Sequence, residues 1–329
     1  MKKLIYSLST PLLLLFFVLA CTDHGIFYPE PDSFSSEAFV SGLKSPVGLA
    51  LDDQGNIWVT EAGTGNNNDD ASISLITPSG GKTTFLTGLE SITNMGSTEG
   101  IGHLLYRSGK LYFLHGVNGR LYTADVSSFK PGDQPVDIND IPSEDVATYI
   151  KSLSLVKVSN SNAFDLAFGP DDHLYIVDAG SNAIFKRDKT TGELSLFTHF
   201  PDAAPNVDAV PTGIVYDGTK FFVSTLSGAP FTAGDAKIYE VDKDGTASVY
   251  QSGFTTLSGI ALSVNNKPIV LKHGTLGARG FVQGSGEVLD GNRKTILKDI
   301  SQPTDIIRAT EKTYYLLSYK DGTITRLSY

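Results

Sequence analysis

The chain has 329 residues and a formal net charge of −10, and 40% of its residues are hydrophobic, which is ample for a sizeable core. Its acidic balance, with no visible cluster of Lys and Arg, argues against a nucleic-acid partner, because neutralising phosphates requires clustered basic side chains. Gly is abundant at 33 residues, Phe and Tyr number 18 and 14, and Met only 2, which suits many short strands joined by tight turns.

The first 20 residues have the pattern of a signal peptide. Lys2 and Lys3 form a short basic region, Pro11–Ala20 is almost wholly apolar, and Val18-Leu19-Ala20-Cys21 resembles the lipobox of bacterial lipoproteins. Cys21 is the only cysteine, so no internal disulfide can form, and its position makes it the predicted lipidation site. An ordinary signal peptide with a chance cysteine is the alternative.

Residues 21–34 are predicted to be the lipidated cysteine followed by a polar tether. Two or three acyl chains on Cys21 would anchor the protein stably in a membrane. Thr22 follows the cysteine and gives no strong signal for retention in the inner membrane. We therefore expect an exported outer-membrane lipoprotein, on either the periplasmic or the surface face.

From residue 35 onwards the chain reads as repeated groups of short apolar runs separated by turn residues. Copies one and two span residues 46–86 and 100–125, and no fourth strand is evident in the second. An insertion follows at 126–161, in which Ser143–Tyr149 is a candidate short helix with Ser143 as its cap. Copies three to six span residues 162–197, 211–251, 257–298 and 303–328.

Copy three is the clearest. Its apolar runs at 166–168, 174–177, 183–187 and 194–197 are separated by turn sequences such as Gly169-Pro170-Asp171-Asp172, which predicts a four-stranded antiparallel meander. Asp165, Gly213, Gly259 and Asp305 occupy equivalent positions 46 to 48 residues apart, close to the period of propeller blades.

Six such copies predict an all-β fold, a six-bladed β-propeller of the NHL/TolB-like kind, over residues 35–329. A sandwich or barrel of similar strands is the alternative, which the regular period disfavours. The last copy lacks a fourth strand, and Glu37–Val40 supplies a spare one. We expect this N-terminal strand to close blade six and leave few exposed strand edges.

Several blocks of the sequence resemble the ScyD/ScyE family. They are Gly42–Gly65, Asp178–Ile184, Val210–Gly213 and Leu226–Tyr239, and the resemblance runs from about Phe39 to the C-terminus. The family is named for proteins of the cyanobacterial scytonemin sunscreen cluster, and its wider membership looks like exported propellers without an established activity. The resemblance implies a six-bladed propeller and export, and it implies no pigment chemistry for this chain.

One face of a propeller carries the loops after each second strand and before each innermost strand, around the channel mouth. The predicted second strands end there at Glu61, His115, Asp178, Thr225, His273 and Ser318. The starts of the innermost strands add Glu99, Asn162, Asp165, Thr256 and Asp305. This ring is acidic, with no obvious Lys or Arg beside it. The candidate ligand-binding residues are Glu61, Glu99, His115, Asn162, Asp178, Asn182 and His273.

Three interpretations of these side chains stay open. Carboxylates and amides could hold Ca²⁺ through oxygen ligands, with Glu61 and Asp178 as the candidate metal residues. Metal-assisted lactone or ester hydrolysis would use the metal to polarise a carbonyl and a carboxylate as base. The third interpretation, which we favour, is structural, because Asp and Asn often accept backbone N–H bonds in turns. No residue is assigned a catalytic role, and no cofactor is certain.

Three further features have a structural and a functional interpretation. His103 is predicted to lie in an innermost strand as core or channel lining. Residues 66–70, Asn-Asn-Asn-Asp-Asp, are predicted to be a solvated loop rather than a Ca²⁺ site. Leu226–Gly234 is an apolar loop with Pro230-Phe231 at its tip, placed to contact a partner or to pack over blade four.

We therefore expect an exported, lipid-anchored propeller that acts as a ligand- or protein-binding module at the cell envelope. Its expected partners are the membrane, through Cys21, and a small molecule or an envelope protein. The alternative is a metal-dependent lactonase- or esterase-like hydrolase using the same channel face. An enzyme is the less favoured of the two.

Overall fold

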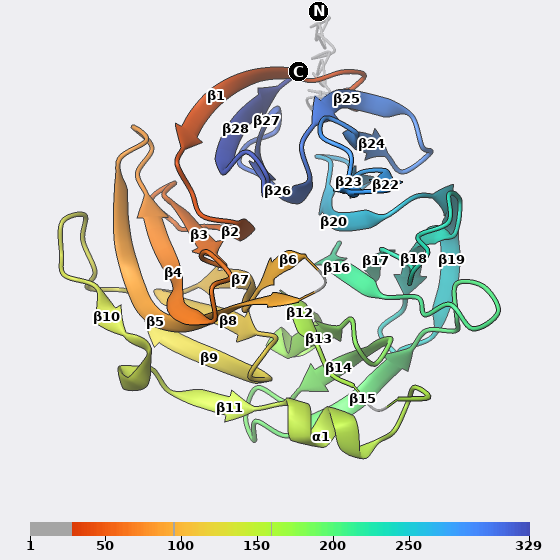
Figure 1. The fold of residues 1–329 in the computed structure, drawn as a ribbon, viewed down its shortest axis with the longest axis horizontal. Coiled ribbons are helices and arrows are strands. Elements are labelled where there is room, and N and C mark those ends of the chain that lie inside the picture. The colour runs from red at the N-terminus through yellow and green to blue at the C-terminus, as the bar shows by residue number, and fades with distance from the viewer. Residues whose placement is uncertain (1–27, 95, 159) are drawn as a thin grey trace, which may run out of the picture.

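The fold was analysed in a computed structural model, which describes residues 28–329 except 95 and 159. The strands form six blades arranged around a central axis, as the sequence predicts, and Figure 1 shows this arrangement. The predicted signal peptide and the predicted lipidation site Cys21 lie outside the described residues. None of the described helices is long and apolar enough to cross a membrane.

Each blade is an antiparallel sheet whose first strand lies nearest the channel. Blade 1 contains β2 (Pro46–Leu51), β3 (Ile57–Glu61), β4 (Asn68–Ile76) and the long β5 (Lys82–Asn94). Blade 2 contains β7 (Ile101–Arg107), β8 (Lys110–His115), β9 (Arg120–Asp125) and β11 (Ser143–Asp145). Blade 3 contains β12 (Ala163–Phe168), β13 (Leu174–Asp178), β14 (Ala183–Arg187) and β15 (Leu194–His199), with the 3₁₀ turn η2 (Pro170–Asp172) after its first strand.

The remaining blades follow the same plan. Blade 4 contains β16 (Pro211–Tyr216), β17 (Phe221–Thr225), β18 (Ala236–Val241) and β19 (Ala247–Phe254). Blade 5 contains β20 (Leu257–Leu262), β21 (Pro268–Lys272), β24 (Gly286–Asp290) and β25 (Thr295–Ile300), with a small hairpin of β22 (Leu276–Gly277) and β23 (Gly280–Phe281) inserted after β21. Blade 6 contains β26 (Pro303–Arg308), β27 (Thr313–Ser318) and β28 (Thr323–Ser328).

The ring closes where the sequence predicts. β1 (Ser35–Ser41) pairs antiparallel with β28, from Ser35 opposite Ser328 to Ser41 opposite Thr323. It becomes the outermost strand of blade 6, so one blade is built from both ends of the described chain. This pairing covers the edge that β28 would otherwise expose.

The predicted helix at Ser143–Tyr149 is wrong in its position. Ser143–Asp145 is instead the strand β11, the fourth strand of blade 2 that the sequence pattern did not reveal. The helix α1 is Ala147–Ser152 with Val146 at its N-cap position, and Asp145 just before it accepts the Thr148 N–H at 2.9 Å. β11 is only three residues long and separated from β9 by the rest of the insertion, so no local pattern marks it.

The rest of this insertion wraps the outside of blades 1 and 2. β10 (Val136–Asp137) pairs in parallel with β5 and adds a fifth strand to blade 1, followed by the 3₁₀ turn η1 (Ile138–Asp140). In addition, β5 pairs with β6 (Ser97–Glu99), and Figure 1 shows β6 reaching in towards the centre of the ring.

The hydrophobic core is divided among the blade interfaces. Six clusters of buried side chains lie between successive blades; one joins Trp58 and Ile73 of blade 1 to Phe113 of blade 2. The second strands β3, β13 and β17 are buried along their whole length, because blades pack against both of their faces. Outer strands such as β15 are more exposed; Ser195, Leu196 and His199 of β15 face solvent.

The antiparallel order gives the propeller two distinct faces. The face that bears the ends of the second strands and the starts of the first is called the mouth face here. The face that bears the turns between first and second, and between third and fourth strands, is called the opposite face. Its turns are fixed by aspartates; Asp290, for example, accepts the N–H groups of Asn292 and Lys294 at 2.9 and 2.7 Å.

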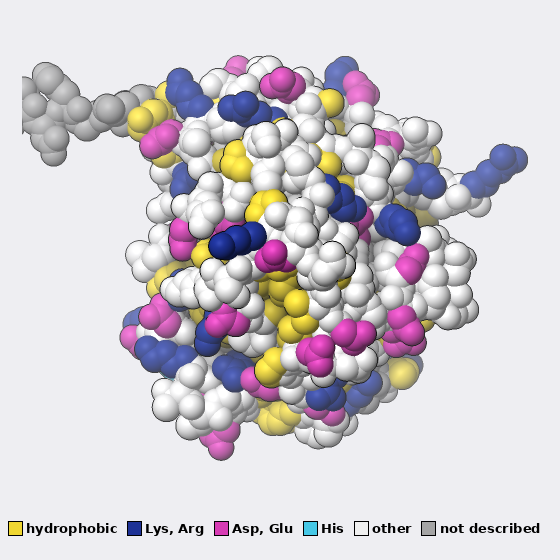
Figure 2. Space-filling view, turned by 90° about the vertical axis from the view of Figure 1, so that its left-hand side faces the viewer, with side chains coloured by type: hydrophobic (Ala, Val, Ile, Leu, Met, Phe, Trp, Pro, Cys, Tyr) yellow, Lys and Arg dark blue, Asp and Glu magenta, His cyan; other side chains and the backbone are white. Residues whose placement is uncertain are grey.

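The flank of the ring around blade 1 carries both signs of charge. Figure 2 shows its acidic and basic side chains interspersed, with smaller apolar areas between them. No large field of one sign appears on this flank, which suits a polar surface facing solvent.

Candidate functional site

Glu61 is a buried member of an ion-pair network. Its carboxylate lies 2.6 Å from Lys82 Nζ and accepts hydrogen bonds from Ser74 Oγ and the Lys44 N–H, both at 2.8 Å. The side chain is only 2% exposed. The expectation that the acidic ring has no basic neighbour is therefore wrong at Glu61, because β5 brings Lys82 across the end of blade 1. This carboxylate ties three strands and a loop together.

Asp178 and Asn182 are likewise occupied by structural bonds. Asp178 is buried and accepts bonds from Ser161 Oγ and the Ser181 N–H, both at 2.7 Å. Burial raises the pKa of this carboxyl above its ordinary value. Asn182 donates to Asp208 Oδ1 and accepts the Val210 N–H, both at 2.9 Å, which holds the loop entering blade 4.

Asn162 and Glu99 lie at the starts of innermost strands or just before them. The Asn162 carbonyl accepts the Ala179 N–H at 2.9 Å, and its side chain packs against Gly116, where any larger residue would clash with it. Glu99 lies on β6, where Asn94 Nδ2 is 3.2 Å from both carboxylate oxygens. Burial raises the pKa of Glu99.

The two histidines at the ends of second strands each have one defined tautomer. The Asn118 N–H donates to His115 Nδ1 at 3.3 Å, so the proton lies on Nε2, which donates to the Glu90 carbonyl at 3.0 Å. His273 Nδ1 donates to the Pro303 carbonyl at 3.1 Å. Burial lowers the pKa of both rings, that of His273 to about 4. Both are neutral hydrogen-bonding groups at neutral pH.

No metal centre is assembled from these residues. Across residues 28–329, leaving out 95 and 159, no group of three or more His, Cys, Asp or Glu side chains is placed to hold a metal ion. Glu61 and Asp178 lie at the ends of second strands in blades 1 and 3, and each is satisfied by its own blade. The donor set that a metal-dependent hydrolase requires is therefore not formed by the predicted residues.

A titratable cluster does exist, but deeper in the channel. His103 Nδ1 lies 3.5 Å from Asp165 Oδ1 and 3.5 Å from Asp305 Oδ2. His103 is buried, as the sequence predicts for an innermost strand, and its Nε2 has no hydrogen-bond partner among the described residues. Burial raises the pKa of Asp165 to about 6, and the nearby Asp305 adds to the rise while His103 opposes it.

The cluster occupies one position of the repeat. The residue just before the buried aliphatic of each innermost strand forms a ring in the channel: Gly48, His103, Asp165, Gly213, Gly259 and Asp305. The sequence pattern identifies four of these as equivalent and misses Gly48 and His103. Aligning copies one and two on Leu49 and Leu104 would have found them. The glycines keep the ring packed; a Cβ on Gly48 would lie 2.7 Å from the His103 Cα.

Among the described residues, hydrogen bonds around the centre of the ring join five of the six pairs of neighbouring blades, all except blades 2 and 3. Asp165 Oδ2 accepts the Ile214 N–H of blade 4 at 2.9 Å, and Asp305 Oδ2 accepts the Leu49 N–H of blade 1 at 2.6 Å. Hydroxyl groups supply other links: Thr60 to Gly102, Thr212 to Leu257, Ser258 to Pro303 and Thr304 to Pro46. Asp165 and Asp305 thus join blades together, which fits the structural interpretation of these two residues.

Two loops of the mouth face meet above blades 4 and 5. Phe231, in the loop Leu226–Gly234, packs 5.8 Å from the ring of Phe281 in β23, and Phe281 packs edge-on to His273 at 4.7 Å. Beside them Leu276 is 43% exposed and Val282 51% exposed. The repeat pattern could not predict this contact, because residues 274–285 are an insertion. We call these two loops, residues 226–234 and 274–285, the mouth loops.

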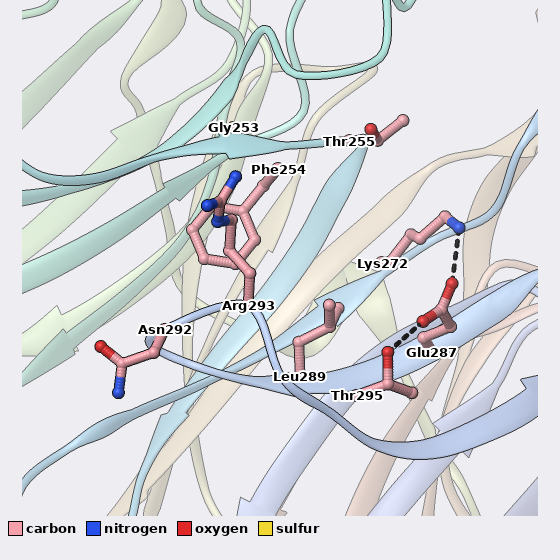
Figure 3. A pocket seen from close by; sticks show the side chains of 9 residues that line it. All are labelled: Gly253, Phe254, Thr255, Lys272, Glu287, Leu289, Asn292, Arg293 and Thr295. Atoms are coloured by element: carbon pink, nitrogen blue, oxygen red, sulfur yellow. Dashed lines mark hydrogen bonds and ion pairs between the residues drawn. The ribbon is translucent and has the colours of Figure 1, made fainter.

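An open cavity of about 450 Å³ lies between the outer strands of blades 4 and 5. Figure 3 shows that a Lys272–Glu287 ion pair and the Thr295 hydroxyl occupy one wall, while Arg293 reaches over Gly253 and Phe254. A second cavity of about 460 Å³ lies between blades 2 and 3, beside α1. Neither cavity contains any of the predicted site residues.

Comparison with known proteins supports the fold. No protein-family model and no curated protein sequence matches this chain. Among solved structures, a streptogramin B lyase is similar at 14% identity and a TM-score of 0.57, covering 92% of this chain and 99% of its own. A putative gluconolactonase is similar at 12% identity and a TM-score of 0.56, covering 91% and 93%.

A third similar structure is the PQQ-bound aldose sugar dehydrogenase of Streptomyces coelicolor, at 15% identity and a TM-score of 0.56, covering 91% of this chain and 99% of that one. The three names describe different chemistries, so the likeness concerns the fold. The blades, their closure and these comparisons together make the chain a six-bladed β-propeller.

Proposed function

We propose that this protein is an exported, lipid-anchored propeller of the ScyD/ScyE type whose mouth face binds a protein partner at the cell envelope. The observation that carries the proposal is the distribution of exposed apolar side chains. Of the five large hydrophobic side chains exposed among the described residues, Leu276, Val282 and Val158 lie in loops that lead to the mouth face. Leu196 and Val249 lie on outermost strands.

A contiguous exposed apolar patch marks a surface that binds other proteins, and Leu276 and Val282 lie together in one mouth loop. The polar side chains of the same face support this reading, because Glu61, Asp178 and Asn182 are engaged in bonds within the fold. Such groups position loops and are not free to act on a substrate. A hydrolase would need carboxylates that converge on a shared point beside a pocket. The lipobox-like sequence at Cys21 supports the anchor.

A site-specific photocrosslinking experiment tests the proposal. A benzophenone amino acid replaces Leu276 in the mouth loops or Leu196 on an outermost strand, two leucines that are 43% and 41% exposed. In the native host, irradiation is expected to give a discrete protein adduct from position 276 and none from position 196. The absence of an adduct at 276, or the same adduct from both positions, would contradict the proposal.

A further inference from the structure

The segment that follows the predicted lipidation site is fastened to one side of the propeller. Asn265 Nδ2 donates to the Tyr28 carbonyl at 3.0 Å and to Glu30 Oε1 at 2.8 Å. Two residues further on, Asp32 forms an ion pair with Lys294. The Phe34 N–H then donates to the Ile296 carbonyl at 2.9 Å, and its ring is buried.

These contacts all lie at the opposite face. Asn265 belongs to the turn between β20 and β21, and Lys294 to the turn between β24 and β25. Because the strands of blade 5 are antiparallel, both turns lie at the same end of the blade, away from the mouth loops. β1 then rises from Ser35, beside the end of β28, to Ser41 near the mouth face.

The length of the remaining tether limits where a membrane can lie. Cys21 precedes Tyr28 by seven residues. A random-coil chain of that length has a typical end-to-end distance of about 15 Å, and a fully extended one spans at most about 25 Å. A blade strand of six residues is about 20 Å long, so acyl chains on Cys21 could reach past the ring to the mouth face only through an almost fully extended segment. The length of the segment therefore favours acyl chains on the side of the opposite face.

The surface of the opposite face is polar. Its turns are polar and held by aspartates such as Asp52 and Asp242, and none of the exposed large hydrophobic side chains of the described chain lies in them. Such a face has nothing to insert into the acyl region, and its attachment would come from the lipid anchor alone.

We propose that the opposite face lies against the bilayer, so that the mouth loops point away from the membrane that holds the anchor. This inference rests on the lipid anchor of the proposed function. It adds that the mouth face is the one accessible to a partner, which approaches the mouth loops from the aqueous side. Blades 5 and 6 lie nearest the anchor point.

The absence of other cysteines makes the orientation measurable. Once Cys21 is acylated, a cysteine introduced elsewhere is the only free thiol in the mature chain. Thr219→Cys places a fluorescent donor on the opposite face, in the turn between β16 and β17, and Thr232→Cys places it in a mouth loop of the same blade. Both threonines are exposed. The lipidated variants are incorporated into phosphatidylethanolamine–phosphatidylglycerol vesicles that carry acceptor dye on lipid headgroups.

Energy transfer to the headgroup acceptors is expected to be roughly twofold or more higher from residue 219 than from residue 232, because the strands between them separate the probes by about 20 Å. If acylated protein shows equal energy transfer from the two positions, or more from residue 232, the proposed orientation is wrong, whereas the lipid anchor is not contradicted. Intact-mass measurement before reconstitution separates the two hypotheses: a mature chain without acyl groups would overturn the anchor and the orientation with it.

Discussion

His103 and Asp305 come from blades 2 and 6, yet the imidazole Nδ1 and the carboxylate Oδ2 lie 3.5 Å apart in the channel. Asp165 of blade 3 approaches the same nitrogen at 3.5 Å. The His103–Asp305 contact joins blades that are not neighbours in the ring, and both carboxylates also accept backbone N–H groups from the next blade. The centre of the ring is thus a buried, titratable structural element.

Asp165 is expected to make stability depend on pH in the acid range. Its pKa rises from 3.8 to about 6 in the fold, chiefly through burial. The native state therefore binds more protons than the unfolded chain between about pH 4 and 6, and the stability contributed by this group is lost as the pH rises through that window. Asp165→Asn removes the titration. Urea unfolding at pH 4 to 7 should show wild type losing up to about 3 kcal/mol relative to the variant.

A difference between wild type and Asp165→Asn that stays constant over this range would contradict the assigned pKa. Asp217→Asn is the matched control, because Asp217 also accepts backbone N–H groups but its pKa is lowered in the fold. Its effect on stability should grow with rising pH below about pH 5, in the direction opposite to that of Asp165.

His273 is expected to make stability depend on pH in the direction opposite to that of Asp165. Burial lowers its pKa from 6.5 to about 4, so the unfolded chain binds the extra proton between these values. Its contribution to stability is complete above about pH 6.5 and is lost as the pH falls towards 4. His273→Gln can still donate to the Pro303 carbonyl but does not titrate. The wild-type stability measured against this variant should therefore fall by up to about 3 kcal/mol on acidification.

Glu61→Gln tests whether the best functional candidate is a structural residue. The substitution leaves Lys82 without its carboxylate partner. We expect a loss of about 3 kcal/mol in unfolding free energy, at the lower end of the range for broken buried pairs because Lys82 is 32% exposed. Glu37→Gln on exposed β1 is the control and should change little. If the stability is unchanged while the photocrosslink at residue 276 is lost, Glu61 would have a direct role in binding.

Phe34→Ala tests the closure of the ring. The Phe34 ring packs 5.2 Å from Tyr314 and 5.8 Å from Tyr329, so its removal leaves a cavity where the N-terminal segment joins blade 6. We expect a loss of about 3 kcal/mol. Ala38→Ser, on the partly exposed β1, is the control. Equal effects of the two substitutions in urea unfolding would mean that closure depends on backbone pairing alone.

The sequence predicted the blades because they repeat. Equivalent positions such as Asp165 and Asp305 recur at a regular spacing, and Glu37–Val40 stood out as an unpaired strand. The strand β11 was not predicted, because three residues show no periodicity and the short polar run before α1 resembles the start of a helix. The repeat period predicts the strands that recur in every blade. The positions of inserted segments depend on tertiary contacts, which the local sequence does not show.

The candidate site was predicted less well, for a physical reason. The chain order places Glu61, His115 and Asp178 at the ends of second strands, but it does not say whether each side chain is already bonded. Lys82 reaches Glu61 only because β4 and β5 bring it back across the blade. The contact between Phe231 and Phe281 joins two irregular loops whose paths no local pattern specifies.

The pairing of β1 with β28 also determines how the molecule would bear mechanical load. A pull on the N-terminal segment, away from the opposite face, acts along the axis of β1, since β1 begins at Ser35 beside Ser328 and runs towards the mouth face. Such a force shears the β1–β28 ladder and loads its hydrogen bonds together, whereas a sideways pull would open them one at a time. The strand that closes the ring is thus also oriented to resist tension applied through the N-terminal segment.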